Sequence, residues 1–311
     1  MITEHFTFLS SDKETLIHAV KWLPDSRKYK AILQITHGMT EHILRYEEFA
    51  AFLTEHEYMV IGHDHLGHGT TAKRKEDFGY FTKSSPSDHL ISDMHTLRIT
   101  IRKENPNVPY FMMGHSMGSY LLRKYLSLHG ESLKGAIVMG TGFVPPVAAV
   151  TGLFLIYAVA LLKGWRYRSP FITGIMFGKS YKQFDQTGSD FSNSWLTRDA
   201  KIVEKNHSDP YTNFKFTLNG YRGLLETVLF DCRYKNIRKI SKDLPVFFVS
   251  GEQDPVGDLG KGVRKTYDLF VKAGIKDVTI KLYKADRHEL VNELDRLDVY
   301  ADLMGFMDKR L

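Results

Sequence analysis

A serine between two glycines is the part of the sequence best suited to chemistry. The motif GHSMG at 114–118 follows the apolar run 108–113, and apolar residues repeat at helical spacing after it until Gly130. Where a strand turns abruptly into a helix, the corner residue is strained and the positions two residues away leave no room for a side chain. The pattern predicts that Ser116 is a nucleophile; the structural alternative is an ordinary βα turn flanked by glycines.

A serine hydroxyl needs a general base within hydrogen-bond reach, and that base needs a carboxylate to orient it. Asp254 and His288 stand just after the last two predicted strands. Parallel strands end at one edge of a sheet, so both side chains should meet Ser116 there, in the order Ser, Asp, His that is typical of an α/β-hydrolase. Glu252 and Asp286 are the less well placed carboxylates. The structural alternatives are a turn aspartate before a proline and a histidine at a helix start.

Acyl transfer also needs hydrogen-bond donors for the oxyanion of the tetrahedral intermediate. One donor should be the backbone N–H of the residue after the nucleophile, which is Met117. The second should come from the loop after the predicted strand 31–36, and we expect Met39 to supply it.

The elements around these residues alternate between strand and helix. The first 23 residues have the pattern of a hairpin, and the buried strands that follow are expected over 31–36, 58–62, 108–113, 135–140, 244–251 and 278–283. Helices are expected over 46–56, from a cap at Ser87 or Asp88 to Glu104, after Ser116, over 263–273 and over 293–309. This alternation predicts an α/β fold with a mostly parallel central sheet and helices on both faces.

The alternation stops between residues 143 and 226, so we predict a core over 1–142 and 227–311 with a helical cap, 143–226, inserted in it. The run 147–162 is nearly all apolar but shorter than the roughly 20 residues that span a bilayer. Basic and aromatic residues follow it. The run is either a cap helix that forms an acyl pocket or an interfacial element that touches lipid. Both interpretations put an apolar wall above Ser116 and favour a substrate with a hydrocarbon chain.

Composition narrows the classes of function. The chain has 311 residues, a net charge of +6 and one cysteine, Cys232, which excludes an intrachain disulfide. The tight basic cluster 73–75 is followed at once by Glu76 and Asp77, so we expect a solvated surface and no nucleic-acid partner. The first residues lack the basic start and apolar core of a secretory signal, and a cytoplasmic location is therefore expected.

A histidine-rich loop follows the predicted strand 58–62. His63, His65 and His68 with Asp64 are residue types that bind zinc. Their spacing only approximates the HxHxDH pattern of metal sites, with the aspartate in the wrong place. We therefore expect a hydrogen-bonded loop, with no metal and no cofactor.

Together these motifs resemble the α/β-hydrolase superfamily, and within it the monoglyceride lipase and lysophospholipase group, which includes members of the serine aminopeptidase type. The resemblance rests on HGMTEH at 37–42 with Arg45 and Tyr46, DHLGHG at 64–69, GHSMG at 114–118, Asp254 and His288. It implies that Ser116, Asp254 and His288 form a catalytic triad, with Met39 and Met117 as the oxyanion donors.

The resemblance also implies that Glu41, Arg45 and His115 hold a glycerol-type head group. The implied activity is hydrolysis of esters that carry a medium or long acyl chain on a small polar head, through an acyl-enzyme. Monoacylglycerol and lysophospholipid are the leading substrates. Transient contact between the cap and a membrane surface belongs to the interfacial interpretation of the run 147–162. The alternatives are a serine peptidase, favoured by an acidic group placed to bind an α-ammonium, and a non-catalytic binding protein.

Overall fold

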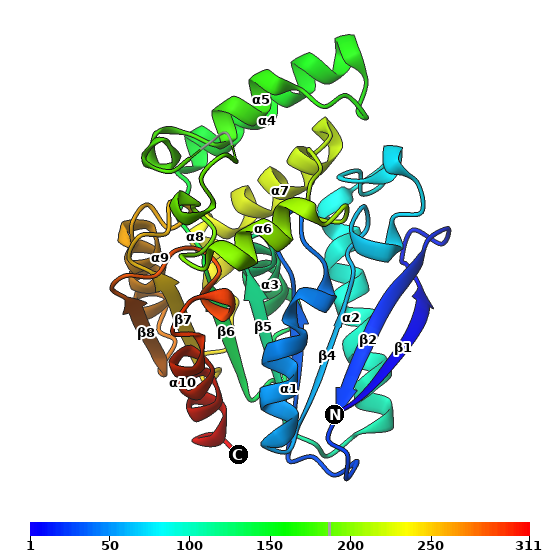
Figure 1. Cartoon of the computed structure of the whole chain (residues 1–311), viewed down its shortest axis with the longest axis vertical. Helices are drawn as coiled ribbons and strands as arrows, with labels where there is room; N and C mark the ends of the chain where they lie inside the picture. Colours follow the sequence, from blue (N-terminus) through cyan, green and yellow to red (C-terminus); the bar gives the residue numbers. More distant parts are fainter. Residues whose placement is uncertain (186–187) are drawn as a thin grey trace.

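The computed structural model describes residues 1–185 and 188–311, and its strands form one sheet (Figure 1). Within these residues the strands are β1 (Ile2–Leu9), β2 (Leu16–Leu23), β3 (Ala31–Thr36), β4 (Tyr58–His63), β5 (Tyr110–His115), β6 (Gly135–Met139), β7 (Val246–Gly251) and β8 (Val278–Tyr283). Their order in the sheet is β1-β2-β4-β3-β5-β6-β7-β8. The β1–β2 hairpin is antiparallel and β2 joins β4 antiparallel, whereas the other neighbours pair parallel. The predicted mostly parallel sheet is confirmed.

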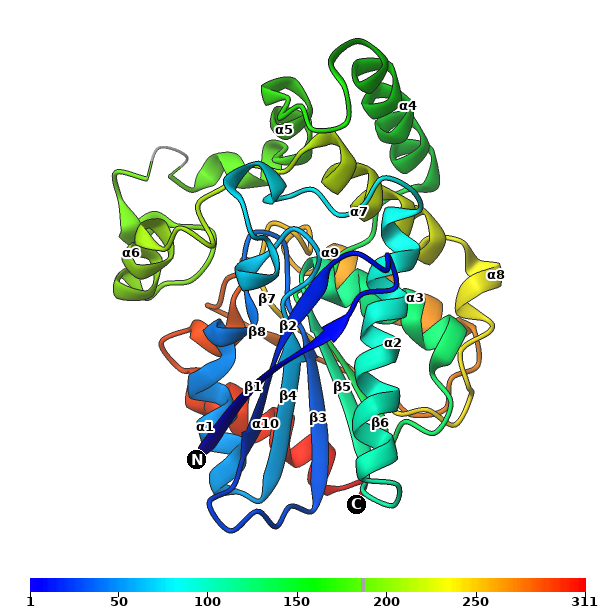
Figure 2. The ribbon, with the colours of Figure 1, turned by 90° about the vertical axis from the view of Figure 1, so that its right-hand side faces the viewer.

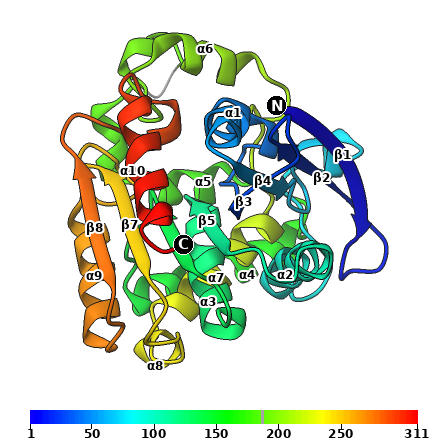
Figure 3. The ribbon, with the colours of Figure 1, turned by 90° about the horizontal axis from the view of Figure 1, so that it is seen from below.

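Helices cover both faces of this sheet (Figure 3). The described helices are α1 (Glu47–Glu55), α2 (Pro86–Glu104), α3 (Met117–His129), α4 (Pro146–Lys163), α5 (Pro170–Met176), α6 (Ala200–Ser208), α7 (Leu218–Asp231), α8 (Tyr234–Ile237), α9 (Lys261–Lys272) and α10 (Arg296–Asp308). Successive strand residues point to opposite faces. In β5, Phe111 and Met113 therefore pack in the cluster that contains α1 and α10. Met112 packs in the cluster that contains α2, α3 and α9.

The start of α2 differs from the prediction. The helix begins at Pro86, with Ser85 as the residue before it, and neither Ser87 nor Asp88 caps it. Proline suits the first position of a helix because its missing N–H would have no partner there. The two predicted caps instead bind the ammonium of Lys124 on α3, whose Nζ lies 2.6 Å from Asp88 Oδ1. They hold α2 against α3.

The segment predicted as a cap lies above the edge of the sheet where the parallel strands end (Figures 1 and 2). Positions 186 and 187, which belong to it, lie outside the described residues. Its predicted end at 226 falls inside α7, which packs against α2 and α3 on one side and α4 on the other. The predicted boundary therefore divides α7 between the core and the cap, and the division of the chain into these two parts stays a prediction.

The apolar run forms the helix α4 and is mostly exposed. Length and composition alone would let this helix cross a membrane, and 17% of it is buried. Ala149 and Ile156 are fully buried, and α4 lies close to α7 at Gly152, where a Cβ atom would meet Leu225. Leu161 on the outer side is 87% exposed. The helix therefore packs along one side and leaves an apolar side uncovered.

Candidate active site

Ser116 stands at a sharp turn between β5 and α3. Its backbone has φ 53° and ψ −121°, a conformation that residues with a side chain rarely adopt. The two flanking glycines are required by close packing. A Cβ atom on Gly118 would lie 2.0 Å from the carbonyl oxygen of Thr36, and one on Gly114 would lie 2.3 Å from the carbonyl oxygen of Gly118. The predicted strand, turn and helix are all present.

His288 and Asp254 meet beneath the predicted cap, residues 143–226, which is called the insertion below. His288 Nδ1 lies 2.9 Å from Asp254 Oδ2, and both residues are buried. Asp254 also accepts hydrogen bonds from Ser250 Oγ at 3.1 Å and from the Val256 N–H at 2.8 Å. A carboxylate beside Nδ1 selects the tautomer that carries its proton there and leaves Nε2 as an acceptor. His288 and Ser116 line the same cavity.

The two less well placed carboxylates do not contact His288 in this arrangement. Asp286 binds the guanidinium of Arg198, with Nη2 2.5 Å from Oδ1. The side chain of Glu252 is 41% exposed, and its Oε1 lies 3.8 Å from Arg264 Nη2. Of the three carboxylates considered from the sequence, Asp254 is the one bonded to the histidine.

Met39 and Met117 line the cavity beside Ser116. Met117 is the first residue of α3, so its N–H has no carbonyl partner within the helix. Met39 lies in the loop after β3, which is held by Glu41 through the Gly38 N–H and by His37, whose Nδ1 lies 2.8 Å from the Gly38 carbonyl. The two N–H groups as oxyanion donors stay a prediction.

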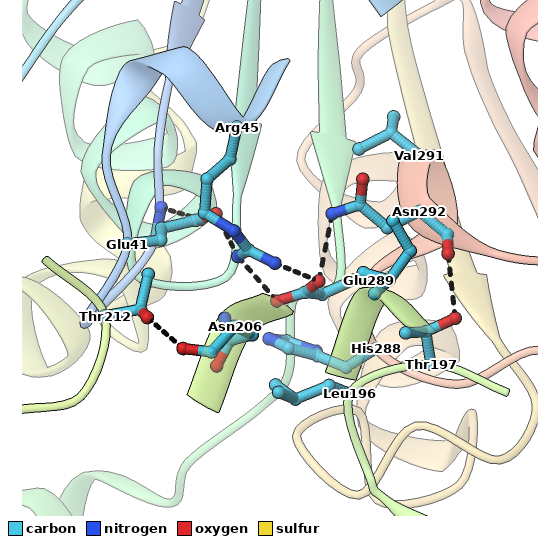
Figure 4. A network of polar contacts seen from close by, with 12 residues as sticks. Glu41, Arg45, Leu196, Thr197, Asn206, Thr212, His288, Glu289, Val291 and Asn292 are labelled. Carbon is cyan, nitrogen blue, oxygen red and sulfur yellow. Dashed lines mark hydrogen bonds and ion pairs between the residues drawn. The ribbon is translucent and has the colours of Figure 1, made fainter. Parts of the chain in front are cut away.

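The residues expected to hold a head group form a buried ionic network (Figure 4). His115 Nδ1 lies 2.9 Å from Glu41 Oε1, Arg45 Nη1 donates to Glu41 Oε2 at 3.1 Å, and Tyr46 donates to Glu41 Oε1 at 3.0 Å. Arg45 also binds Glu289 through two hydrogen bonds of 2.8 and 2.7 Å. The network lines the cavity with Glu41, Arg45 and His115, and their contact with a head group stays a prediction.

The charges of this network sustain one another. Burial alone would raise the pKa of Glu41, but His115 and Arg45 hold that pKa well below its ordinary value. Burial alone would lower the pKa of His115, but Glu41 outweighs it and raises that pKa. The network therefore favours a carboxylate at Glu41, close to the Gly38 backbone that precedes the predicted oxyanion donor.

The histidine-rich loop packs ring against ring. The ring centroid of His65 lies 4.3 Å from that of His37 and 4.8 Å from that of His63. Burial lowers the pKa of His63 and of His68 to about 3, so both rings are neutral near pH 7. Among the described residues, ligand atoms close enough to share one ion occur on Asp286, Glu293 and Asp295, and not on this histidine cluster.

Asp64 organises that loop through hydrogen bonds, as predicted. Its carboxylate accepts from the Ile43 N–H, the Thr70 N–H and His18 Nδ1, at 2.9, 2.9 and 2.8 Å. These bonds join the loop after β4 to the strand β2 through His18, and to the residues before α1 through Ile43.

The insertion supplies much of the cavity, which has a volume of about 410 Å³. Apolar side chains line part of it: Val144, Met176, Phe177, Leu224, Leu225 and Val228. Polar side chains line another part: Thr40, Asn206, His207, Thr212 and Asn213. Asn206 and Thr212, which are labelled in Figure 4, line this cavity together with Glu41, Arg45 and His288.

Sequence reasoning missed several of these residues. The ring of Trp195 lies 5.1 Å from the ring of His288, centroid to centroid, and Leu196 lines the cavity beside it. Asn206, Thr212 and Glu289 were also missed. The polar run 206–213 contains two of them, but it does not stand out in the sequence because charged and polar residues are also frequent over 179–205.

Several known proteins are similar to this chain in sequence. The family model described as "Serine aminopeptidase, S33" matches residues 27–295. The "Monoglyceride lipase homolog" of Monkeypox virus is 35% identical over 284 residues, which cover 90% of this chain and 89% of that protein. The human "Monoglyceride lipase" is 26% identical over 296 residues, with 93% and 86% covered.

A solved structure gives the same result. A highly thermostable carboxyl esterase from Bacillus coagulans, in complex with glycerol, has a TM-score of 0.90 and 28% identity, and the match covers 100% of this chain and 99% of that one. The α/β-hydrolase fold expected from the motifs is confirmed. The family match spans nearly all of the residues that build the site, and the chain belongs to the serine aminopeptidase S33 family of α/β-hydrolases.

Proposed function

We propose that this protein is a serine hydrolase that cleaves esters of a medium or long acyl chain on a small polar head, with monoacylglycerol as the first candidate and lysophospholipid as the second. The relatives and the structural neighbour named above are a monoglyceride lipase, a monoglyceride lipase homolog and a carboxyl esterase, and this chain is a carboxylic ester hydrolase like them. The triad and the acyl specificity are the parts of this proposal that rest on the site alone.

The mechanism follows from the side chains around Ser116. Ser116 Oγ attacks the ester carbonyl while His288 Nε2 takes its proton, and the Met39 and Met117 N–H groups stabilise the oxyanion. His288 then protonates the leaving alcohol, which yields an acyl-enzyme. Water attacks that ester with His288 again as the base, and His288 then returns the proton to Ser116 Oγ as the acid leaves. Asp254 stays ionised and stabilises the imidazolium.

One observation carries the proposal. The Asp254–His288 bond of 2.9 Å leads to a histidine that shares a cavity with a serine on a strained turn. Backbone strain of this kind costs stability and typically persists where a side chain must be presented. An ordinary βα turn has no need of a buried histidine and carboxylate beside it.

The cavity supports the choice of substrate. Apolar side chains of the insertion, residues 143–226, would surround a hydrocarbon chain, and we propose that this segment acts as the cap. The polar side chains near Glu41 and Arg45 suit a head group with hydroxyls. The Bacillus coagulans esterase was solved with glycerol, which agrees with a glycerol head group here.

The test is a substrate panel with a nucleophile variant. Monoacylglycerols and lysophospholipids of matched acyl chain should be compared by fatty-acid release, and the better substrate names the head group. Ser116→Ala should lower kcat by more than about 10³-fold in a chain that still folds. Normal turnover in that variant would remove the serine mechanism.

A peptidase on this fold is the second candidate, because the family model is named for an aminopeptidase. Such an enzyme needs an acidic group to bind an α-ammonium. Glu41 and Glu289 line the cavity, but each is already paired with Arg45. This pairing argues against the peptidase, and aminoacyl p-nitroanilides should be turned over far more slowly than esters.

The exposed side of α4 supports a further part of the proposal, transient contact with a lipid surface. Phe154, Leu161 and Leu162 are 71%, 87% and 85% exposed on the helix that faces away from the sheet. Exposed apolar side chains beside basic residues are typical of helices that lie in a membrane interface. A cytoplasmic location stays a prediction, and contact with lipid from that side is compatible with it.

A further inference from the structure

Residues 194–198 of the insertion, here called the strap, lie against the loop that carries His288. We propose that the strap positions His288 for catalysis and that Arg198 is the positioning residue that fastens it. The catalytic part of this inference rests on the proposed function, because it takes His288 as the general base.

Backbone hydrogen bonds join the strap to the histidine loop. The N–H of His288 lies 3.4 Å from the Trp195 carbonyl, and the N–H of Glu289 donates to the Leu196 carbonyl at 2.7 Å. The hydroxyl of Thr197 donates to the Asn292 carbonyl at 2.8 Å (Figure 4). Two segments about 90 residues apart in sequence therefore pair side by side at the position of the base.

Arg198 binds three carboxylates at the end of this pairing. Its Nη2 lies 2.5 Å from Asp286 Oδ1 and 2.6 Å from Asp295 Oδ1, and its Nε donates to Glu293 Oε2 at 3.0 Å. Asp286 and Glu293 are fully buried. Without the guanidinium, buried like charges would face one another with no counterion, which is strongly unfavourable. The loop that contains His288 would then have to move.

A second arginine joins the same segments in the opposite direction. Arg287, the residue before His288, donates to the carbonyls of Ser192 and Ser194 at 3.0 and 2.5 Å. Its own N–H donates to Glu293 Oε1 at 2.9 Å, so Glu293 is shared by both arginines. The backbone on either side of His288 is thus held by the insertion, whereas Asp254 holds the imidazole ring.

The consequence is a coupling between the insertion and the base. The strap also carries Trp195 over the His288 ring and Leu196 into the cavity wall. Any displacement of the strap moves the wall of the cavity and the backbone of the base together. With a short ester that makes little use of this wall, the displaced base dominates, and Arg198 should therefore affect kcat more than KM.

The test compares Arg198→Ala and Arg198→Lys with a matched control, Arg166→Ala. Arg166 also joins the insertion to the core, with Nη1 3.1 Å from Asp77 Oδ1, but it does not belong to the strap. With a short soluble ester, Arg198→Ala should lower kcat by about 10²-fold with KM changed less than about twofold, because a small misplacement of a catalytic group has this effect. Arg198→Lys should recover much of the loss, and the control should stay within about twofold.

A readout independent of turnover is the downfield proton resonance of the His288 Nδ1–H in its bond to Asp254. We expect it in the wild-type protein and in Arg166→Ala, and shifted or lost in Arg198→Ala. An unchanged resonance in folded Arg198→Ala overturns the positioning role, whether or not the chain cleaves esters. Equal losses in Arg198→Ala and Arg166→Ala overturn it as well.

A milder variant guards against a misfolded Arg198→Ala. Asp286→Asn removes one of the three charges on Arg198 and leaves no buried carboxylate without a counterion. It should shift the same resonance by less than Arg198→Ala and lower kcat by less. A wild-type protein that has the resonance but releases no acid from any ester would contradict the proposed function, while the resonance in the variants would still decide the positioning role.

Discussion

The backbone of Ser116 is strained, which lowers the stability of the fold. Its backbone, φ 53° and ψ −121°, lies where glycine is tolerated and other residues are strained by about 1–3 kcal/mol. The neighbouring glycines relieve collisions with the backbone at Thr36 and at the start of α3 but leave the corner residue itself strained. The backbone strain is therefore confined to Ser116.

This strain predicts a difference between two inactive variants. Ser116→Gly should be more stable than Ser116→Ala by about 1 kcal/mol, because glycine relieves the strain and loses only part of that gain to its greater freedom in the unfolded chain. Urea unfolding of both variants measures the difference. Equal stabilities would mean that the turn is not strained.

Asp254 should matter through the tautomer of His288. Asp254→Asn should lower kcat by about 10³–10⁴-fold, because an amide no longer selects the proton on Nδ1 or stabilises the imidazolium. Steady-state kinetics with a soluble ester measures this. Glu252→Gln is the matched control, since Glu252 lies in the same turn and its side chain is 41% exposed. A similar loss in both variants would contradict the assignment.

Glu41 should stabilise the fold in a way that depends on pH. Because its pKa is held below the ordinary value of 4.5 in the folded state, its contribution is present above pH 4.5 and is lost as the pH falls. Glu41→Gln should cost about 3 kcal/mol of unfolding free energy at pH 7, since it breaks a buried ionic network. Below pH 4.5 the gap to wild type should narrow by up to about 1.4 kcal/mol per pH unit. A gap that does not change with pH would contradict the ionised network.

At the scale of elements, α4 has two different sides. One is buried against α7 and the other leaves Phe154 and Leu161 exposed. Phe154→Glu with Leu161→Glu should reduce binding to phosphatidylcholine vesicles and leave turnover of a soluble short ester unchanged. Sedimentation with vesicles measures the binding. Leu297→Glu on α10, where Leu297 is 64% exposed, is the matched control and should bind vesicles as wild type does.

Vesicle binding that is unchanged in the α4 variant would contradict the proposed lipid contact. Equal loss in the α10 control would mean that any exposed leucine contributes, with no role special to α4.

The elements of the core could be predicted because each carries its own local pattern. The strands 31–36 and 278–283 have the predicted bounds, and Asp254 and His288 follow strands whose ends the fold brings together. The insertion has no comparable local pattern of apolar residues. Arg198 reaches Asp286 across 88 residues and Trp195 reaches His288 across a similar span, and no local spacing indicates either contact. The start of α2 was missed because Lys124, far along the chain, uses Ser87 and Asp88.

At the scale of the whole molecule, the proposed site lies between the predicted core, which carries Ser116, Asp254 and His288, and the predicted insertion, which supplies much of the cavity wall. The strap and α7 connect the two parts, the first at His288 and the second along α3.

The cavity between these parts predicts a dependence on chain length. In a series of p-nitrophenyl esters, kcat/KM should rise by about fourfold for each added methylene, which corresponds to about 0.8 kcal/mol per buried CH₂, until the cavity of about 410 Å³ is full. A soluble series below the micellar limit gives the rates. A flat profile would contradict an acyl pocket lined by the insertion.

The most direct test of the account is covalent labelling with a long-chain alkyl fluorophosphonate, followed by mass spectrometry of the labelled peptide. A phosphonate reacts with a serine that a base has activated. We expect one adduct, on Ser116, with the label absent from Ser116→Ala and strongly slowed in His288→Ala and Asp254→Asn. A label on another residue, or unchanged labelling in the His288 variant, would contradict a triad of Ser116, His288 and Asp254.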